Sequence, residues 1–408
     1  MSATPARRLP RWSEIRPLLN LRRPSLDRLG TRLRRASAVG DLRELARRRV
    51  PRAVFDYVDG AAEEEISLAR ARDAFRHVVF HPRILRDVSS VDLGRRLLGR
   101  DAALPLVLGP TGFTRMMHHE GERAVARAAA RAGVPYTLST MGTTSIEDVA
   151  GAAPHGRNWF QLYLWRDREA SAELVARARD AGYDTLVLTV DTPVAGARLR
   201  DHRNGMTIPP MLGLRTIADM SRHPRWWADV LTTEPLAFAS LTHWRGTVAE
   251  LVGIMFDPSA GLDDLEWLRR TWDGSLVVKG IQHVQDARDV VEAGADAVVV
   301  SNHGGRQLDR APTPLHLLPE IVDAVGSRAE VYLDTGVLTG ADVVAAIGLG
   351  ATGVFLGRAY LYGLMAGGER GVDRMFELLT AEMTRTLQLL GVPRLDDVGR
   401  EHVTARPE

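Results

Sequence analysis

A histidine, two glycines and an arginine lie together in the stretch Ser301-Asn302-His303-Gly304-Gly305-Arg306-Gln307-Leu308-Asp309. An imidazole titrates near neutral pH, so His303 could remove a proton from a substrate. The paired glycines let a ligand approach the backbone closely, and the Arg306 guanidinium can donate two parallel hydrogen bonds to a carboxylate. A histidine in a loop is more often structural, yet this combination predicts a general base beside a site for an anion.

Asp191 is the residue best suited to orient that base. It lies in Thr189-Val190-Asp191-Thr192-Pro193, directly after an apolar run, and a carboxylate there could hold and charge-stabilise the imidazole of His303. The alternative is a turn or helix cap, which aspartate also forms readily. Arg198 follows in the same loop as a second candidate for binding a carboxylate, although an isolated arginine would ordinarily lie on the surface.

Lys279 is the single lysine among 53 basic residues, and all the others are arginine. It ends the apolar run Leu276-Val277-Val278-Lys279, which is typical of a buried strand. An ammonium is a compact charge and a guanidinium a wide planar fork, so a site fitted to lysine does not accept arginine. We therefore predict a specific role for Lys279; the alternative is a remnant of biased composition.

Other candidates follow the remaining apolar runs. Asp334-Thr335-Gly336 and Gly357-Arg358 have the glycines and the arginine of a phosphate site, although tight turns would also explain the glycines. Gln161 and Tyr163 alternate with Leu162 and so point to the same side of a strand. Tyr57 could donate to a substrate oxygen, although an aromatic residue before a helix usually belongs to the core.

His118-His119-Glu120 has residue types that bind metals, but neighbouring side chains point apart. We interpret it as the start of a helix and predict no metal site.

The elements that must position these residues alternate regularly from about residue 100. Eight short apolar runs are separated by amphipathic segments of helical length, among them 120–132, 168–181, 284–293, 315–325 and 341–349. The runs are 104–108, 136–138, 159–163, 185–190, 276–279, 297–301, 331–334 and 354–356. This order predicts an α/β fold, a (β/α)8 barrel, whose active site lies at the carboxyl ends of the strands.

We expect two regions: an arginine-rich arm at 1–40 and a barrel domain at 41–408 with an insertion at about 199–260. The arm carries ten arginines against Glu14 and Asp27, which is typical of a solvated arm, with an acidic partner or an anionic lipid surface as the alternative. Residues 41–76 look helical, with Asp41 as the N-cap of a helix at 42–49. A loop as long as the insertion is usually functional or disordered.

The bulk composition excludes several classes of protein. The chain of 408 residues has a net charge of +2, which gives no case for nucleic-acid binding, and it has no cysteine, which excludes disulfides and thiolate catalysis. An inosine-monophosphate-type dehydrogenase, which needs a nucleophilic cysteine, is excluded with them. No run of 18 apolar residues occurs, so no membrane span is expected. A cytoplasmic location is the default.

Taken together, these motifs resemble the FMN-dependent L-2-hydroxy-acid dehydrogenase and oxidase family over about residues 40–403. Within it the chain is most similar to bacterial respiratory L-lactate dehydrogenases, which pass electrons to quinone or a cytochrome. The closer likeness rests on 55–60, 109–115, 193–198, 358–363 and the tryptophan-rich insertion. The resemblance implies FMN as cofactor, a homotetramer or other homo-oligomer, and a location in the cytoplasm or at the inner face of the cell membrane.

The resemblance also implies a role for each matching residue. His303 would be the base, paired with Asp191; Arg198, Arg306 and Tyr57 would bind the substrate carboxylate, and Tyr163 its reacting oxygen. Lys279 would lie at the N1/O2 edge of the flavin. The residues implied to line the flavin are Thr111, Ser139, Gln161, Thr189 and Ser301, and those implied to hold its ribityl-phosphate are Asp334, Gly336, Gly357 and Arg358.

Three positions qualify the resemblance. Leu338 stands where many members have a phosphate-binding arginine, and Thr335 replaces a usual glycine, so the phosphate has one fewer cation. Gly112 is similar to the dehydrogenases, because oxidases often carry alanine there. Met141 and Ala195 would lie near the substrate side chain and leave room for a small group, which favours L-lactate.

Three other functions stay open. One is an oxygen-dependent 2-hydroxy-acid oxidase, one a Schiff-base aldolase with Lys279 as nucleophile, and one a barrel that binds a flavin or a partner without catalysis. For the insertion we expect a peripheral membrane contact, in which aromatic and apolar side chains lie among arginines. Packing of its tryptophans on the barrel or on a neighbouring subunit is the alternative. The residues concerned are Met211, Leu212, Leu214, Arg215, Arg222, Arg225, Trp226, Trp227 and Leu231.

Overall fold

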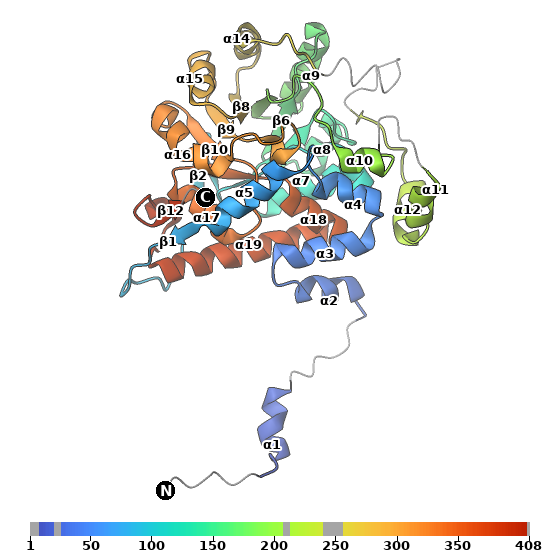
Figure 1. The fold of residues 1–408 in the computed structure, drawn as a ribbon, viewed down its shortest axis with the longest axis vertical. Coiled ribbons are helices and arrows are strands. Elements are labelled where there is room, and N and C mark those ends of the chain that lie inside the picture. The colour runs from blue at the N-terminus through green and yellow to red at the C-terminus, as the bar shows by residue number, and fades with distance from the viewer. Residues whose placement is uncertain (1–7, 20–25, 207–212, 240–255, 406–408) are drawn as a thin grey trace.

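Eight parallel strands close into a barrel in the computed structural model, which describes residues 8–19, 26–206, 213–239 and 256–405. Going round the barrel, each strand pairs with the next in sequence, and β11 closes the ring on β4 (Figure 1). The strands are β4 (Leu106–Leu108), β5 (Tyr136–Ser139), β6 (Asn158–Leu162), β7 (Thr185–Thr189), β8 (Ser275–Ile281), β9 (Ala297–Val300), β10 (Glu330–Leu333) and β11 (Gly353–Leu356). The predicted (β/α)8 barrel is confirmed, and each predicted apolar run overlaps one strand.

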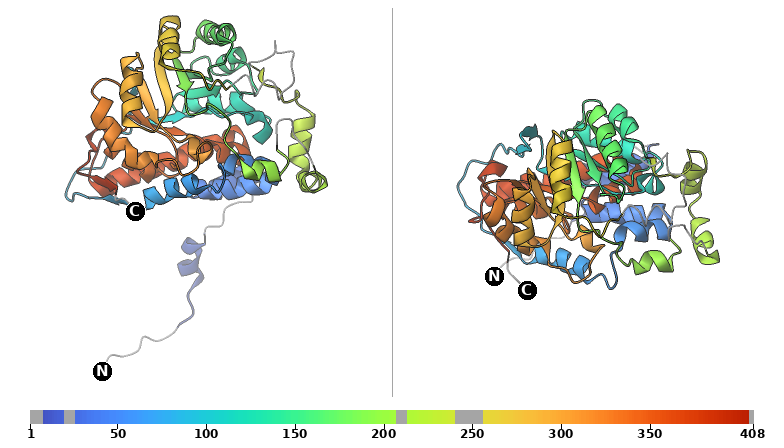
Figure 2. Two further views of the ribbon diagram at one scale, coloured as in Figure 1. Left: turned by 45° about the horizontal axis from the view of Figure 1, so that its top comes forward. Right: turned by 90° about the horizontal axis from the view of Figure 1, so that it is seen from above.

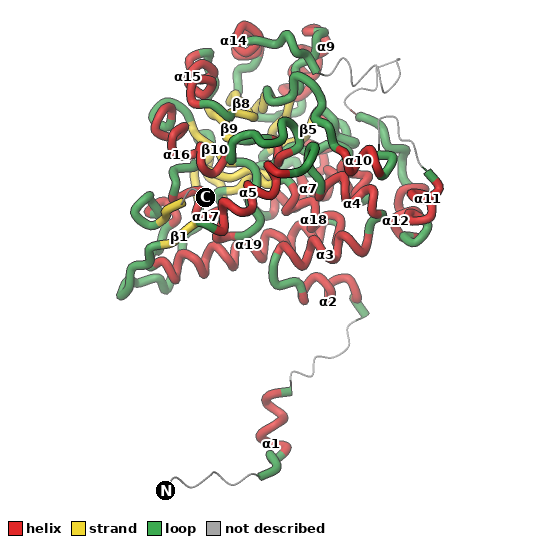
Figure 3. Tube along the Cα trace, in the orientation of Figure 1, coloured by secondary structure: helices red, strands yellow, loops and turns green. Residues whose placement is uncertain are grey.

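Helices surround this barrel and cover its outer face (Figure 3). Strands buried on both faces are continuously apolar, as Leu106–Leu108 and Ala297–Val300 are. Short side chains cap several helices: Ser145 accepts from the amide of Asp148 at the start of α8, and Thr339 from that of Asp342 at the start of α17. The covering helices are α7 (Gly121–Arg131), α8 (Ile146–Ala152), α9 (Arg168–Asp180), α14 (Leu262–Thr271), α15 (Val284–Glu292), α16 (Pro314–Val325), α17 (Gly340–Gly348) and α18 (Arg358–Gly367).

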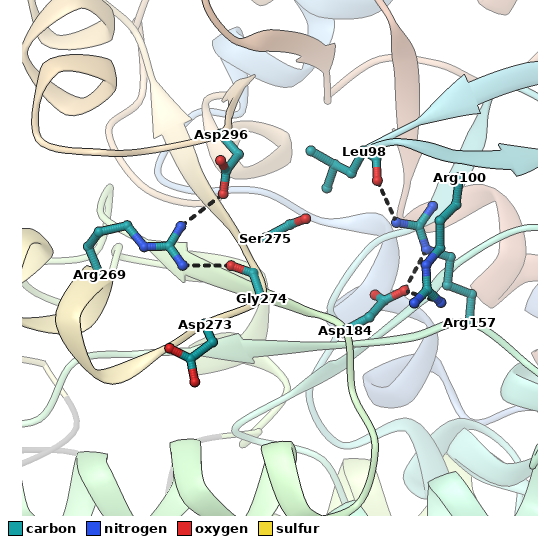
Figure 4. Close-up of a pocket in the computed structure, with 9 residues that line it drawn as sticks. All are labelled: Leu98, Arg100, Arg157, Asp184, Arg269, Asp273, Gly274, Ser275 and Asp296. Carbon is teal, nitrogen blue, oxygen red and sulfur yellow. Dashed lines mark hydrogen bonds and ion pairs between the residues drawn. The ribbon is translucent and has the colours of Figure 1, made fainter.

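The amino end of the barrel is closed by aromatic packing and ion pairs. Trp159, Tyr332 and Phe355 are buried together inside it, and the hairpin β2 (Arg95–Leu97) and β3 (Arg100–Ala102) adds the buried Leu97. Outside this plug, the carboxylate of Asp184 lies 2.8 Å from Arg157 and 3.1 Å from Arg100. Figure 4 shows these groups lining a hollow of about 430 Å³, in which acids and bases are balanced. This end of the molecule is built for stability rather than for binding.

Helices from both ends of the chain pack on one side of the barrel. They are α2 (Arg28–Arg35), α3 (Val39–Arg49), α4 (Arg52–Asp59), α5 (Ile66–Arg76) and the long α19 (Glu369–Leu390). The expected N-cap at Asp41 is wrong, because α3 begins at Val39 and Asp41 lies in its first turn. Its carboxylate there accepts from the amides of Ser37 and Ala38. The chain ends are further tied by β1 (Val78–Phe80), which pairs with β12 (Val403–Ala405).

The last part of the expected arm contacts the body of the protein. Leu33 of α2 is buried, α2 packs on α18 and α19, and Asp27 pairs with Arg370 of α19. Further towards the amino end lie the short helix α1 (Trp12–Ile15) and a 3₁₀ turn at Arg16–Leu18.

Within the insertion the structure describes α10 (Leu199–Arg203), α11 (Leu214–Met220) and α12 (Pro224–Leu231). The two views of Figure 2 place α11 and α12 at the edge of the body. Trp226 is buried, and its indole N–H donates to the carbonyl of Met116 at 2.8 Å, so the expected membrane contact is wrong for this residue. Leu214 and Leu231 are 86% and 74% exposed. Met211 and Leu212 lie outside the described residues.

Candidate functional site

Four of the predicted site residues form a row across neighbouring strands. In the strand register, Ser139 of β5 is the partner of Gln161 of β6, and Thr189 of β7 is the partner of Lys279 of β8. All four are buried, and all lie at or near the carboxyl end of their strand. The barrel therefore presents one polar strip at the end where such folds carry their active sites.

His303 and Asp191 form the predicted pair. The imidazole Nδ1 lies 2.9 Å from Asp191 Oδ1, and the carboxylate side chain is only 3% exposed. The 3₁₀ turn at His303–Gly305 holds the ring, and the amide of His303 donates to Ser301 Oγ at 3.0 Å. Since the carboxylate accepts the proton on Nδ1, the lone pair of Nε2 is left for a substrate. This is the geometry of a general base.

Two guanidinium groups share the ring of Tyr57. Cζ of Arg306 lies 5.1 Å and Cζ of Arg198 lies 5.4 Å from its centroid. Arg198 pairs with Asp201 at 2.9 Å, whereas Arg306 has no ion pair with any described residue and donates to the carbonyl of Tyr57 at 2.6 Å. Burial lowers the pKa of Arg306, and the neighbouring Arg198 lowers it further. A bound carboxylate would offset both effects, because a negative charge nearby raises the pKa of a guanidinium.

Tyr163 belongs to the same cluster. It is buried, and burial raises the pKa of its hydroxyl, as do the nearby charge of Asp191 and the hydroxyl of Tyr57. Its ring packs edge-on against Phe256, with centroids 5.5 Å apart. The hydroxyl therefore stays protonated at neutral pH and can donate a hydrogen bond to a substrate oxygen.

Lys279 has a polar and a charged partner directly after β9 and β10, Ser301 and Asp334. Its ammonium lies 3.1 Å from Asp334 Oδ2 and donates to Ser301 Oγ at 3.2 Å, and Ser301 in turn donates to Asp334 at 2.6 Å. Burial alone would lower the pKa of Lys279, but the charges of Asp334 and Asp191 raise it above its usual value. Burial would likewise raise the pKa of Asp334, and Lys279 and Ser301 hold it below its usual value. Lys279 and Asp334 therefore both stay charged at neutral pH and form a buried ion pair at the end of the strip.

A polar planar ring would fit beside this strip, because two of its buried polar atoms lack partners. Gln161 Nε2 and Thr189 Oγ1 make no hydrogen bond within the described structure, although Gln161 Oε1 accepts from Ser139 at 3.0 Å. Buried groups of this kind are ordinarily satisfied, so they indicate a ligand with its own donors and acceptors. A flavin ring has such groups along one edge, and the Lys279 ammonium suits an edge that becomes negative on reduction.

The turn after β10 and the start of α18 have the backbone expected of a phosphate site. Gly336 has φ +89°, and Gly357 caps the ten-residue helix α18, whose first amides are free to receive an anion. Thr335 takes the strained φ of +85° where a glycine would be relaxed. Its hydroxyl accepts from the amide of Gly304 at 3.0 Å, so the threonine ties this turn to the His303 loop.

Arg358 and Arg72 supply the cations near these turns. Arg358 donates to three carbonyls, those of Val58, Gly304 and Gly60, and so links α4 to the His303 loop. At the position of the missing family arginine, Leu338 is partly buried against the core. Arg72, from α5, donates to the carbonyl of Gly336 and pairs with Asp342 at 2.7 Å. Sequence reasoning did not single out Arg72, because it lies far from the barrel motifs in the chain.

Comparison with known proteins agrees with this geometry. The family described as FMN-dependent dehydrogenase matches residues 46–405. This chain belongs to that family. A Mycobacterium tuberculosis protein named "Putative L-lactate dehydrogenase" is 58% identical over 398 residues, with 98% of this chain and 96% of that protein covered. An L-lactate dehydrogenase of Stenotrophomonas maltophilia is 43% identical, with 91% of this chain and 99% of that protein covered.

Among solved structures, the crystal structure of the monotopic membrane protein (S)-mandelate dehydrogenase matches with a TM-score of 0.88 and 39% identity. The match covers 91% of this chain and all of the other. The chain is therefore an FMN-dependent dehydrogenase, an oxidoreductase on a (β/α)8 barrel, and the cofactor expected from its sequence is confirmed as FMN.

Several residues that hold the site of this FMN-dependent dehydrogenase were not predicted to do so. The side-chain amide of Gln307 donates to the carbonyls of Asp191 and Val194, and its oxygen accepts from the amide of Gly196. Asp309 accepts from the amide of Ser67 at 2.8 Å. Both stand in the His303 motif, but only the folded chain shows that they tie this loop to the Asp191 loop and to α5.

Thr111, the remaining flavin candidate, lies 2.5 Å from the hydroxyl of Tyr360, just after β4. The His118-His119-Glu120 group has ligand-type atoms within 4.8 Å of one another. The guanidinium of Arg49 lies 3.0 Å from His118 Nε2, and a cation beside it disfavours a metal ion. The absence of a metal site stays a prediction.

Proposed function

We propose that this FMN-dependent dehydrogenase oxidises L-lactate to pyruvate and passes the electrons to quinone or a cytochrome. One observation carries the substrate class: Arg306, a partly buried arginine that forms no ion pair with any described residue, lies beside Arg198 over one tyrosine ring, near a histidine with a free Nε2. This arrangement suits a small carboxylate with a neighbouring hydroxyl. L-Lactate is favoured because the relatives 40–58% identical carry that name.

In this proposal each side chain has a distinct task. Arg306 and Arg198 bind the carboxylate of L-lactate, and Tyr57 and Tyr163 hydrogen-bond its oxygens. His303 Nε2 takes a proton from the substrate, and Asp191 stabilises the imidazolium that results. FMN, when bound, accepts the two electrons that leave the substrate carbon. The ammonium of Lys279 stabilises negative charge at the cofactor edge, while Gln161 and Thr189 satisfy its polar atoms.

The proposal is tested by following the flavin absorbance of the purified protein under argon. L-Lactate should bleach it, whereas D-lactate should not. Glycolate and (S)-mandelate serve as comparison substrates, because a larger side chain must find room beside Met141. Bleaching by (S)-mandelate with no response to L-lactate would contradict the proposed substrate. Absence of bleaching by any 2-hydroxy acid would contradict the proposed substrate class.

An oxygen-dependent oxidase is the second candidate, and Gly112 bears on it. An added Cβ at this position would lie 2.9 Å from Met141 Cβ and 3.3 Å from its carbonyl oxygen, so the loops after β4 and β5 are fitted to glycine. The family resemblance associates glycine here with dehydrogenases. Hydrogen peroxide formed in step with pyruvate in air would favour the oxidase; slow reoxidation in air with fast reoxidation by a quinone analogue would favour the dehydrogenase.

The proposed acceptor requires contact with a membrane or a membrane-bound partner. Among the described residues, no helix has the length and apolar character needed to cross a bilayer. The exposed Leu214 and Leu231 of the insertion support a peripheral contact at the inner face of the cell membrane. Quinone-coupled activity should fall when both are replaced by serine, and activity with a soluble dye should survive. Equal loss of both activities would mean that these leucines support the fold.

A further inference from the structure

A groove of about 860 Å³ is lined by residues of α2, α3, α18 and the start of α12, and none of these lining residues belongs to the site described above. Figure 1 shows where these helices lie in the fold. Its walls are basic. Seven arginines line it: Arg28, Arg32 and Arg35 from α2, Arg48 and Arg49 from α3, and Arg222 and Arg225 beside α12. The family match begins at residue 46, so the wall formed by α2 lies outside it.

The positive charge in this groove is largely unneutralised. Six of the seven arginines are exposed and make no side-chain hydrogen bond or ion pair with any described residue. The seventh, Arg49, lies 3.8 Å from Asp229, which also lies 3.3 Å from His119. No carboxylate is among the described residues that line the groove. Elsewhere on this protein exposed arginines commonly pair with acids, as Arg47 does with Glu44.

The guanidinium groups also lie close enough to repel one another. Burial lowers the pKa of Arg49, and Arg225 of α12 and Arg32 of α2 lower it further, against Asp229 and Glu120, which raise it. Three separate helices thus direct like charges toward one volume. Such an arrangement is unfavourable without an anion and favourable with one.

The floor of the groove is apolar. Leu29, Leu45 and Ala366 line it together with Pro224, and the leucines are only partly buried against the core. A free phosphate would use the arginines but leave this floor in water. We infer that the groove binds an anionic phospholipid of a membrane surface, with the headgroup phosphate on the arginines and the first part of an acyl chain on the apolar floor.

This inference rests on the proposed function in one respect, the peripheral membrane contact, which it extends to a specific lipid site; the groove contains none of the residues assigned to flavin or substrate. It adds a second contact beside the exposed leucines of α11 and α12. A second copy of the chain is the competing occupant, and it would need a matching acidic face. A phosphate group and guanidinium groups are complementary in geometry as well as in charge, which favours the lipid.

The test is co-sedimentation of the full-length holoprotein with vesicles of phosphatidylcholine alone or mixed with phosphatidylglycerol. The protein should bind the mixed vesicles in a salt-sensitive manner and leave pure phosphatidylcholine unbound. Arg32→Gln with Arg225→Gln should weaken binding about 25-fold, since each basic residue near an anionic surface contributes about five-fold. Arg96→Gln with Arg328→Gln is the matched control, since both arginines are exposed, lie outside the groove and make no side-chain hydrogen bond or ion pair with described residues.

Each other outcome has a defined meaning. Equal weakening by the two double variants would show binding through net charge alone and overturn the site, as would no binding by the wild type. In a thermal-shift arm, monomeric dihexanoyl phosphatidylglycerol should stabilise the wild type, and inorganic phosphate at the same concentration should not. Equal stabilisation would make this a free-anion site and overturn the lipid assignment.

Two further measurements separate this inference from others. The oligomeric state of the wild type and of the Arg32→Gln, Arg225→Gln variant should be the same in solution. An oligomer that forms in the wild type and dissociates in the variant would identify the groove as a subunit interface instead. Reduction of the flavin by L-lactate should be unchanged in all variants. If that reduction fails in the wild type while vesicle binding persists, the proposed substrate is wrong and the lipid groove stands.

Discussion

Replacing Lys279 by methionine should destabilise the protein in a way that only a buried ion pair explains. Lys279 is 4% exposed, and its ammonium lies 3.1 Å from Asp334 Oδ2. Methionine fills similar volume without charge, so Asp334 would keep only the hydrogen bond from Ser301 at 2.6 Å. Removing one partner of a buried pair costs about 3–5 kcal/mol of unfolding free energy. Urea unfolding at a fixed excess of FMN would measure it, because bound ligand itself adds stability.

The pH dependence of this loss identifies its cause. In the wild type, Lys279 holds the pKa of Asp334 below its usual value against the effect of burial. Without the lysine, burial raises the pKa of Asp334 above its value in the unfolded chain. The variant is therefore destabilised most at neutral pH, and it recovers stability relative to the wild type as the pH falls and Asp334 takes a proton. Adding Asp334→Asn should restore most of the loss at pH 7. A loss under about 1 kcal/mol that does not vary with pH would refute the reasoning.

The other predictions concern separate parts of the molecule. His303→Gln should keep FMN bound but reduce kcat about 10²–10⁴-fold, as measured with a soluble dye; near-normal turnover would exclude it as the base. Arg306→Lys keeps the charge but loses the planar fork, so kcat/KM for L-lactate should fall at least about ten-fold, and an unchanged value would remove Arg306 from the substrate site. Gly112→Ala should cost about 1–3 kcal/mol, because its methyl meets Met141 at 2.9 Å; an unchanged melting temperature would show that the loops adjust freely. Burial, with Arg49 and His119, lowers the pKa of His118 to about 3, so its contribution to stability is complete above pH 6.5 and is lost as the pH falls toward 3. His118→Asn should flatten that part of the stability curve, and an unaltered acid profile would contradict this.

The barrel and the centre of the site were predictable because their signals are local. An apolar run followed by polar residues marks a strand and its carboxyl end, and that pattern alone is enough to place His303, Asp191 and Lys279 at one edge of the barrel. The single lysine was informative for a physical reason as well, since its slot is lined by Asp334 and Ser301 at ammonium distances.

The errors and omissions concern contacts between distant parts of the chain. The sequence around Trp226 indicated a tryptophan at a membrane interface, but its indole N–H donates to the carbonyl of Met116, which lies 110 residues away in the chain. The phosphate role of Arg358 stays a prediction, and nothing in the sequence indicated that its side chain donates to the carbonyls of Val58 in α4 and of Gly60, the residue after that helix. Asp41 was expected as an N-cap, but it is the third residue of α3. The sequence does not separate the two positions, because aspartate is favourable both as an N-cap and in the first turn of a helix.

The close contact of the two site loops limits how substrate preference can be transferred between relatives. A Cβ on Gly196 would lie 2.9 Å from Gln307 Cα and even closer to the carbonyl oxygen of Arg306, so at Gly196 the backbones of the two loops touch without space for a side chain. Gln307 then joins them through the carbonyls of Asp191 and Val194. In a chimera that takes only one of these loops from another enzyme, the new loop would not fit the loop that it must contact. Grafts that exchange both loops as a unit should express and turn over, whereas single-loop grafts should misplace the base.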